Sequence, residues 1–264
     1  MTDSRAVEGL VRAGLVARGV LHAVVGILAL LVAAGRQRQA PDNHGALAAV
    51  ASQPLGKLLL AAVAVGFAGY ALWRLLSALL DVEGEGAGAG GWLKRAGDAG
   101  RGLFYCSLVV LALRLLTGSS GDDQTKEADL TAKVLALSGG RVAVALVGVA
   151  VIGAGIYNGY RAVSGKYRKK LRTGRLSGTA RRWVTSMATV GLGARMVVFC
   201  LIGAFLVKAA VRYDPNQAVG VDGALARLAA RPHGPWLLGL VALGLFAYGL
   251  YLFVEARYRR VLDG

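Results

Sequence analysis

The feature that most constrains this fold is a set of six long apolar segments arranged as three consecutive pairs. The segments span roughly residues 16–34, 57–80, 101–118, 140–160, 190–212 and 235–254. Each has about the length that a helix needs to cross a bilayer core of about 30 Å. The second and third pairs repeat landmarks of the first, so the sequence predicts one helical hairpin used three times.

The odd-numbered segments align through an arginine near the start of each one. These arginines are Arg18, Arg101 and Arg195. In this register a ring-bearing residue stands at the fourth position after each arginine, as His22, Tyr105 and Phe199.

The even-numbered segments align through glycines at positions 66, 153 and 244. Aromatic residues follow four and seven positions later in every copy, as Tyr70 and Trp73, Tyr157 and Tyr160, and Tyr248 and Tyr251. Offsets of four and seven lie on one side of a helix. Each even-numbered helix is therefore predicted to carry an aromatic face.

A shorter element recurs between the two segments of a pair. The stretch GALAAVASQPLG, Gly45 to Gly56, returns as GALARLAARPHG, Gly223 to Gly234, and more loosely at residues 129–140. We predict that these elements are short helices on the outward side of the membrane, and that Pro54 and Pro232 end the first and the last.

These patterns predict an all-α integral membrane protein. Its six transmembrane helices would form three parallel two-helix repeats with pseudo-threefold symmetry, because a repeat with an even number of spans always enters the membrane from the same side. The composition agrees, since 55% of residues are hydrophobic and only 17% are charged. Such a chain is too apolar for an ordinary soluble domain.

The formal charge of +16 is expected in the loops, because a cation at mid-bilayer costs about 2.5 to 3.5 kcal/mol. The loop between the fourth and fifth segments has no acidic residue, and its basic residues are Arg161, Lys166, Arg168, Lys169, Lys170, Arg172, Arg175, Arg181 and Arg182. This loop is therefore predicted to be cytoplasmic, together with both termini, in the inner (plasma) membrane. The basic residues flank apolar segments, which argues against nucleic acid as the partner.

The boundaries divide the chain into seven parts. They are a cytoplasmic N-terminal segment (1–15), repeat 1 (16–80), a Gly-rich cytoplasmic linker (81–100), repeat 2 (101–160), a basic cytoplasmic loop (161–189), repeat 3 (190–257) and a C-terminal tail (258–264). The linker contains GEGAGAGG at Gly84 to Gly91. This stretch follows no strand and lacks the lysine of a phosphate-binding loop, so we interpret it as flexible.

Four motifs resemble one known family. They are ARG at Ala17 to Gly19, YDP at Tyr213 to Pro215, GVDGALARLA at Gly220 to Ala229 and GPWLLGLVALGLFAYGLY at Gly234 to Tyr251. In these motifs the chain resembles the bacterial membrane proteins grouped as domain-of-unknown-function 1206. The resemblance covers nearly the whole chain and implies six spans in three two-helix repeats. It implies no activity and no ligand-binding residues.

The repeated arginines are the first candidates for a binding site. If Arg18, Arg101 and Arg195 face the axis, they form a ring at one membrane depth that could hold an anion or a lipid phosphate. Alternatively, each arginine anchors its helix by reaching toward the interface and stacks on the ring one turn later. Glu255 is expected at a similar level and is a possible charge partner for one of them.

Two further cations occupy equivalent positions within the apolar segments. Arg114 and Lys208 each follow the repeated arginine of their own segment by thirteen residues, a rise of about 20 Å along a helix. Such cations usually face the protein interior or a wet cavity and mark a function. The alternative is that both long side chains reach outward to the membrane surface.

The remaining candidates have structural explanations. The aromatic faces at Tyr70, Trp73, Tyr157, Tyr160, Tyr248 and Tyr251 are most simply an interfacial belt or helix packing. Cys106 and Cys200 lie in apolar segments, and neither a disulfide framework nor a metal motif accompanies them. We expect no cofactor, and we expect no enzymatic activity because no acid–base pair or activated nucleophile is visible.

Two functions follow as hypotheses. The first is that the protein binds or passes a small anionic solute through the three-repeat bundle, using Arg18, Arg101, Arg195, Arg114 and Lys208. The second is a lipid-binding or scaffolding protein whose basic loop contacts anionic phospholipids of the bilayer. The sequence predicts neither the identity of the solute or lipid nor the oligomeric state.

Overall fold

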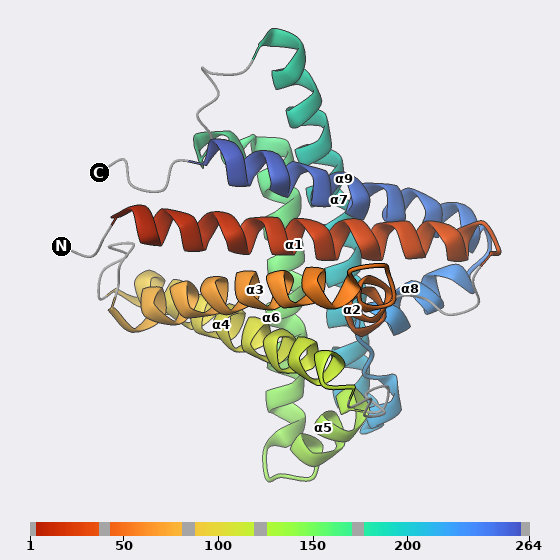
Figure 1. The fold of residues 1–264 in the computed structure, drawn as a ribbon. Coiled ribbons are helices and arrows are strands. Elements are labelled where there is room, and N and C mark those ends of the chain that lie inside the picture. Colours follow the sequence, from red (N-terminus) through yellow and green to blue (C-terminus); the bar gives the residue numbers. More distant parts are fainter. Residues whose placement is uncertain (1–3, 37–42, 81–87, 119–125, 171–176, 260–264) are drawn as a thin grey trace. The chain divides into compact units, whose positions relative to one another are not determined.

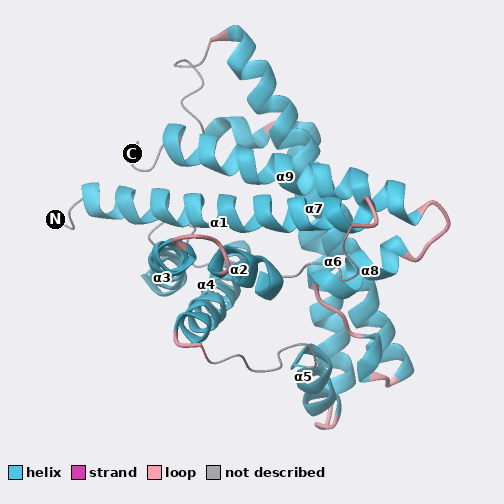
Figure 2. Ribbon diagram, turned by 45° about the vertical axis from the view of Figure 1, so that its right-hand side comes forward, coloured by secondary structure: helices cyan, strands magenta, loops and turns pink. Residues whose placement is uncertain are grey.

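The computed structural model describes residues 4–36, 43–80, 88–118, 126–170 and 177–259. The described elements are helices (Figures 1 and 2). The long helices are α1 (Ser4–Ala33), α3 (Gly56–Leu80), α4 (Ala89–Leu116), α6 (Gly140–Ser164), α7 (Gly178–Arg212) and α9 (Gly234–Tyr258). The short ones are α2 (Asn43–Ala51), α5 (Lys126–Leu135), α8 (Val221–Ala229), and the 3-10 helices η1 (Lys166–Lys170) and η3 (Pro215–Gln217).

The fold class predicted from the sequence is confirmed, because the six long helices are also long and apolar enough to cross a membrane. The candidate spans are Val11–Ala33, Gly56–Leu80, Gly90–Leu116, Gly140–Ser164, Gly178–Arg212 and Gly234–Tyr258. A helix satisfies all of its backbone hydrogen bonds within one segment, which is the condition for crossing hydrocarbon.

Each repeat also contains the predicted short helix, followed by the same turn into the next long helix. The residue directly before the long helix has a positive φ in all three copies, at Leu55 (64°), Gly139 (80°) and His233 (60°). The next residue is a glycine whose N–H donates to the carbonyl three residues earlier, from Gly56 (2.7 Å), Gly140 (2.9 Å) and Gly234 (2.7 Å). The second repeat therefore keeps this turn, although it lacks the proline of the other two.

Three helices begin well before their apolar segments, and the first of them is α1, which starts at Ser4, inside the predicted N-terminal segment 1–15. α4 starts at Ala89, inside the predicted linker 81–100, and α7 starts at Gly178, inside the predicted loop 161–189. Apolar residues mark only the part of a helix that lies in hydrocarbon, so the predicted spans omit the more polar first turns of these helices. Residues 84–87 of the Gly-rich stretch and residues 171–176 of the basic loop lie outside the described residues.

The chain forms two compact units. Unit 1 comprises Met1–Leu21, Leu47–Ser120 and Leu252–Gly264, and unit 2 comprises His22–Ala46 and Gly121–Tyr251. Helices α1 and α9 each contribute to both units.

In unit 1, glycines bring α1 and α3 into close contact. A Cβ added to Gly14 of α1 would lie 2.5 Å from the Cβ of Tyr70 on α3. A Cβ on Gly66 of α3 would lie 2.8 Å from the Cβ of Ala17 on α1. On its other side α3 packs against α4, beside it in Figures 1 and 2, where Gly102 of α4 meets Leu75. Small residues at these points let the helix backbones approach closely.

In unit 2, α7 and α9 repeat this contact at equivalent positions. A Cβ on Gly191 of α7 would lie 2.6 Å from the Cβ of Tyr248 on α9. Gly244 of α9 faces Ala194 of α7 in the same way. The hairpins of repeats 1 and 3 thus share the same glycine contacts, at positions that the alignment of Gly66 with Gly244 makes equivalent.

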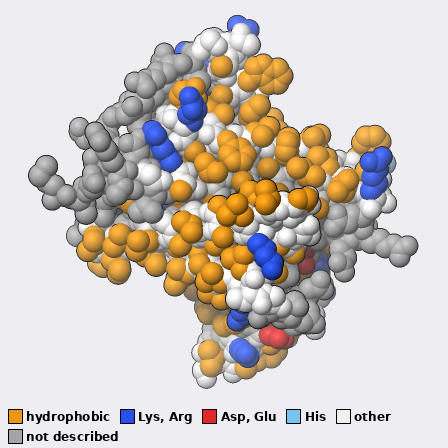
Figure 3. Space-filling model, viewed as in Figure 1, with side chains coloured by type: hydrophobic (Ala, Val, Ile, Leu, Met, Phe, Trp, Pro, Cys, Tyr) orange, Lys and Arg blue, Asp and Glu red, His pale blue; other side chains and the backbone are white. Residues whose placement is uncertain are grey.

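Apolar side chains also cover much of the outer surface, as the orange side chains in Figure 3 show. On α3 and α6 the exposed ones recur every seven residues, at Leu58, Val65, Leu72 and Leu79 and at Val142, Val149, Ile156 and Val163. Seven residues are about two helical turns, so each series forms one apolar stripe. A bilayer is the solvent that such stripes require.

The YDP motif ends α7 and opens the connection to α8. Tyr213 adopts a positive φ of 52°, and its hydroxyl donates to Leu135 O at 3.1 Å. The Asp214 carboxylate accepts from the Gln217 side chain at 2.9 Å and from Asn216 N at 3.0 Å. These hydrogen bonds lower the pKa of Asp214 below its usual value. The motif therefore links the end of α7 to α5 through Tyr213 and to η3 through Asp214.

The first prediction concerns the glycine contact. We expect Gly191→Ala to destabilise the protein by about 1–3 kcal/mol, because the new methyl group must displace Tyr248. Gly193→Ala on the same helix is the matched control, since a Cβ there meets nothing within 4 Å. Thermal unfolding in a neutral detergent compares the two variants. Equal midpoints for both would contradict the packing described for α7 and α9.

Candidate functional site

The first of the repeated arginines, Arg18, lies against two tyrosine rings of unit 1. Its NH1 donates to the Tyr70 hydroxyl at 3.0 Å, and its guanidinium carbon is 4.8 Å from the centre of that ring. The Tyr105 ring of α4 is 5.7 Å away. The guanidinium group is thus held by cation–π contacts and a hydroxyl acceptor from two neighbouring helices.

A buried ion pair, not singled out in the sequence, lies beside this contact. Arg74 of α3 and Asp98 of α4 are only 7% and 9% exposed at their side chains, and Arg74 NH1 lies 2.8 Å from Asp98 Oδ1. Arg74 Nε donates to the same Tyr70 hydroxyl at 3.0 Å. Arg101 reaches Asp98 Oδ1 at 3.2 Å, while its side chain stays 53% exposed. We call Arg18, Tyr70, Arg74, Asp98 and Arg101 the unit 1 charge network.

The network explains how unit 1 tolerates charge inside an apolar bundle. A buried charge needs an ion pair or hydrogen bonds to offset its desolvation. Arg74 and Arg101 pair with Asp98, and Arg18 donates to the Tyr70 hydroxyl. Arg74 stands eight positions after Gly66, where the third repeat has Leu252. A charged residue within an apolar segment is the signal that could have found it.

In unit 2, Arg195 has an environment equivalent to that of Arg18. Its guanidinium carbon is 4.7 Å from the Tyr248 ring centre and 4.9 Å from that of Phe199. NH1 lies 3.4 Å from His22 Nε2. The contact with Phe199 is the stacking one turn later that the second interpretation of the arginines predicts. The anion-binding role of the repeated arginines stays a prediction.

The other predicted residues are distributed as follows. Glu255 forms an ion pair of 2.8 Å with Arg259, one turn later on its own helix. Arg114 is exposed in the last turn of α4, where a cation is favoured by the helix dipole. Lys208 is half-buried on α7.

The aromatic faces differ between repeats. Tyr70, Tyr248 and Tyr251 are buried, Trp73 is half-buried, and Tyr157 and Tyr160 are exposed. Helix packing therefore accounts for the faces of α3 and α9, and the face of α6 is the exposed one.

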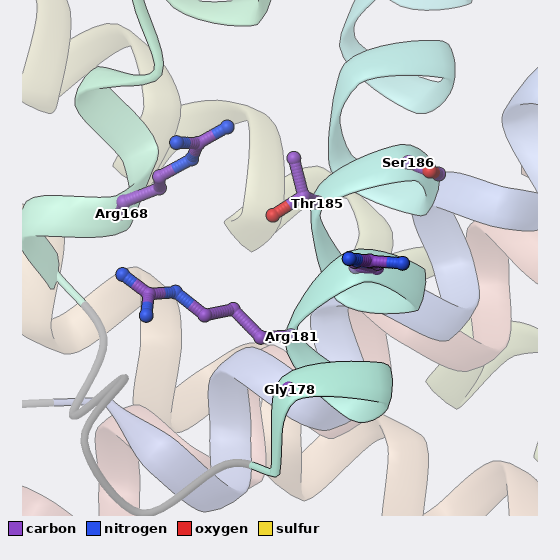
Figure 4. A pocket seen from close by; sticks show the side chains of 6 residues that line it. Arg168, Gly178, Arg181, Thr185 and Ser186 are labelled. Carbon is purple, nitrogen blue, oxygen red and sulfur yellow. The ribbon is translucent and has the colours of Figure 1, made fainter.

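A cavity of about 610 Å³ lies in unit 2 between η1 and the start of α7. Its lining residues are Arg168, Gly178, Arg181, Arg182, Thr185 and Ser186. Figure 4 shows the side chains of Arg168 and Arg181 extending into the same space from η1 and α7, with the Thr185 hydroxyl facing it. We call this cavity the basic pocket.

Tyr167 fixes the wall of the basic pocket that η1 provides. Its side chain is only 1% exposed, although it lies in the most basic stretch of the chain. The ring packs edge-on against Tyr251 of α9 at 5.9 Å. The hydroxyl donates to Thr185 O at 3.3 Å and lies 3.2 Å from Thr189 Oγ1. Because Arg168 is the next residue after Tyr167, this anchor fixes the position of the Arg168 backbone at the edge of the pocket.

Electrostatically the basic pocket is uncompensated within the described residues. There, the side chains of Arg168, Arg181 and Arg182 form no ion pair and donate to no carboxylate, and residues 161–189 contain no Asp or Glu. The N-terminus of α7, capped by the Ser177 side chain at 3.4 Å from Ala180 N, adds positive potential. The arrangement is suited to an anion.

The positive charge of Lys166, next to the pocket, is also stabilised. A hydrogen bond with Tyr160 raises the pKa of Lys166, the first residue of η1, above its usual value. The ammonium lies 4.7 Å from the Tyr160 ring centre. Among the described residues, no group of three His, Cys, Asp or Glu side chains could hold a metal ion.

The second prediction tests the buried ion pair. We expect Arg74→Met to lower the free energy of unfolding by about 3–5 kcal/mol, because Asp98 would then lose its buried partner. Adding Asp98→Leu should recover much of that loss, since it removes the buried carboxylate that Arg74→Met leaves with only the exposed Arg101 as a partner. Unfolding of the single and double variants in detergent measures this coupling. Arg114→Met, an exposed change of the same type, is the control; an equal effect from it would contradict the buried pair.

Comparison with known proteins agrees with the threefold organisation. A model of the family described as Domain of Unknown Function (DUF1206) matches three stretches, residues 13–81, 96–165 and 190–259. An uncharacterized protein of Bacillus subtilis (strain 168), YxxB, is 36% identical over 250 residues, which are 95% of this chain and 90% of that protein. No solved structure matches the chain. The three matched stretches confirm the three repeats predicted from the sequence.

Proposed function

Because the chain belongs to the DUF1206 family, whose description carries no activity, we propose a function from the geometry of this chain: it binds the phosphate of anionic phospholipids in the basic pocket. The protein is a multi-pass membrane protein. In this proposal the membrane is the bacterial inner membrane, the pocket and both termini face the cytoplasm, and the function is binding without catalysis.

The observation that carries the proposal is the convergence of three arginines on one cavity. Guanidinium groups bind phosphate oxygens through pairs of N–H donors in a planar fork. Here Arg168 comes from η1, whereas Arg181 and Arg182 come from α7, so the groups approach from two elements. A solvated basic loop would not need the buried Tyr167 anchor that holds η1 in place.

The position of the pocket along α7 supports a lipid as the source of the phosphate. Trp183 directly follows the two α7 arginines and is 64% exposed. Exposed tryptophans are enriched at the depth of lipid headgroups. Anionic lipids also attract basic residues near the surface by about 1 kcal/mol per charge. The arginines and the tryptophan together match the layer in which lipid phosphates lie.

The third prediction tests this binding function. We expect the triple variant Arg168→Gln, Arg181→Gln, Arg182→Gln to bind anionic lipid at least about tenfold more weakly than the parent, because charge-assisted hydrogen bonds are lost. Native mass spectrometry of the full chain in a neutral detergent, titrated with phosphatidylglycerol or phosphatidylcholine, counts the bound lipids.

A control variant with the same loss of charge separates the pocket from general attraction. Arg12→Gln, Arg161→Gln and Arg257→Gln remove three cations outside the pocket on the same predicted side. We expect this control to keep most of the binding. Equal weakening in both variants would overturn the pocket as the site.

Binding or passage of a small anionic solute, the other function that the sequence predicts, stays a prediction based on Arg114 and Lys208. The half-burial of Lys208 within the span of α7 is the observation that favours it. The fourth prediction is anion flux into liposomes by the parent and none by the variant Arg114→Ala, Lys208→Ala. A parent that shows no flux above empty liposomes, for any of several radiolabelled anions, would reject this function.

A further inference from the structure

We infer that the basic pocket selects a doubly charged phospholipid headgroup, one with at least three terminal phosphate oxygens, over a single phosphodiester. The inference rests on the proposed function and names the ligand class of the same site. Headgroups of this class carry either a phosphate monoester, as in phosphatidate, or two linked phosphodiesters, as in cardiolipin.

The number of hydrogen-bond donors is the first argument. Each guanidinium group offers five N–H donors in a planar fork. The three arginines of the pocket therefore present three forks, and Thr185 adds a hydroxyl that faces the same space (Figure 4). A phosphodiester has only two terminal oxygens to receive them. A monoester has three and a pair of phosphodiesters has four, so these groups satisfy more of the donors.

Charge balance leads to the same class. The pocket contains Arg168, Arg181 and Arg182 and no carboxylate. One phosphodiester would leave an excess of two positive charges next to the positive end of the α7 dipole. A dianion reduces that excess, although the three arginine side chains are themselves exposed to solvent.

The size of the cavity admits such a headgroup. About 610 Å³ lies within the range of about 300–1,000 Å³ that is usual for small-molecule sites. A single phosphate would contact only part of the lining. Because Gly178 carries no side chain and a Cβ there would meet nothing within 4 Å, the start of α7 leaves this space open.

The experiment compares four lipids on the same purified full-length protein in neutral detergent. Phosphatidate, cardiolipin, phosphatidylglycerol and phosphatidylcholine are titrated, and native mass spectrometry gives the half-saturating concentration of each. We expect phosphatidate and cardiolipin to bind about tenfold more tightly than phosphatidylglycerol, as one further charge-assisted hydrogen bond would give. Phosphatidylcholine measures binding without net charge.

Two further arms separate headgroup recognition from surface charge. Below its second pKa, about 6 for a phosphate monoester, phosphatidate carries one charge and should bind like phosphatidylglycerol. In Arg168→Lys the charge remains but the fork is lost, so we expect the preference to fall while binding to phosphatidylglycerol persists. Glycerol phosphate, which lacks acyl chains, should compete poorly.

The outcomes distinguish this inference from the function on which it rests. Equal half-saturation by all three anionic lipids would overturn the dianion preference and leave anionic-lipid binding intact. No excess of any anionic lipid over phosphatidylcholine would overturn the proposed function itself. Full competition by glycerol phosphate would instead identify a soluble phosphate ester as the ligand and reject the lipid.

Discussion

The contact on which the hairpins of repeats 1 and 3 depend is a tyrosine ring packed between a glycine and an arginine of the neighbouring helix. Tyr70 lies against Gly14 and beneath Arg18, and Tyr248 lies against Gly191 and beneath Arg195. The glycine removes the side chain that would hold the helices apart. The ring then provides a polarisable surface for a cation that hydrocarbon alone would reject. One residue type thus meets a packing demand and an electrostatic demand together.

Much of this fold could be predicted because the relevant information is local and repeated. Segment length predicted the six spans, and the alignment of Gly66 with Gly244 predicted which positions of the even-numbered helices are equivalent. The ion pair of Arg74 with Asp98 was missed because its two members come from different repeats and Asp98 has no counterpart in the other copies. An alignment of repeats detects the residues that the copies share, and it gives no signal for a residue that is present in only one copy.

The candidate site divides in the same way. The charge of residues 161–189 and its predicted place beside the membrane are properties of composition. The pocket depends on the burial of Tyr167 against Tyr251, a contact between segments that are far apart in the sequence. A tyrosine among lysines and arginines gives no periodic signal, so its anchoring role becomes visible only when α9 is in place.

The length of α7 has a mechanical consequence. Its 35 residues form one unbroken helix of about 52 Å, which exceeds the thickness of a hydrocarbon core by roughly 20 Å. Two arginines of the basic pocket, Arg181 and Arg182, therefore lie on the same rigid helix as Arg195 and Lys208. A tilt of α7 would displace its two ends in opposite directions. A ligand that moves the first turns of α7 at the pocket would therefore also move the opposite end of the helix.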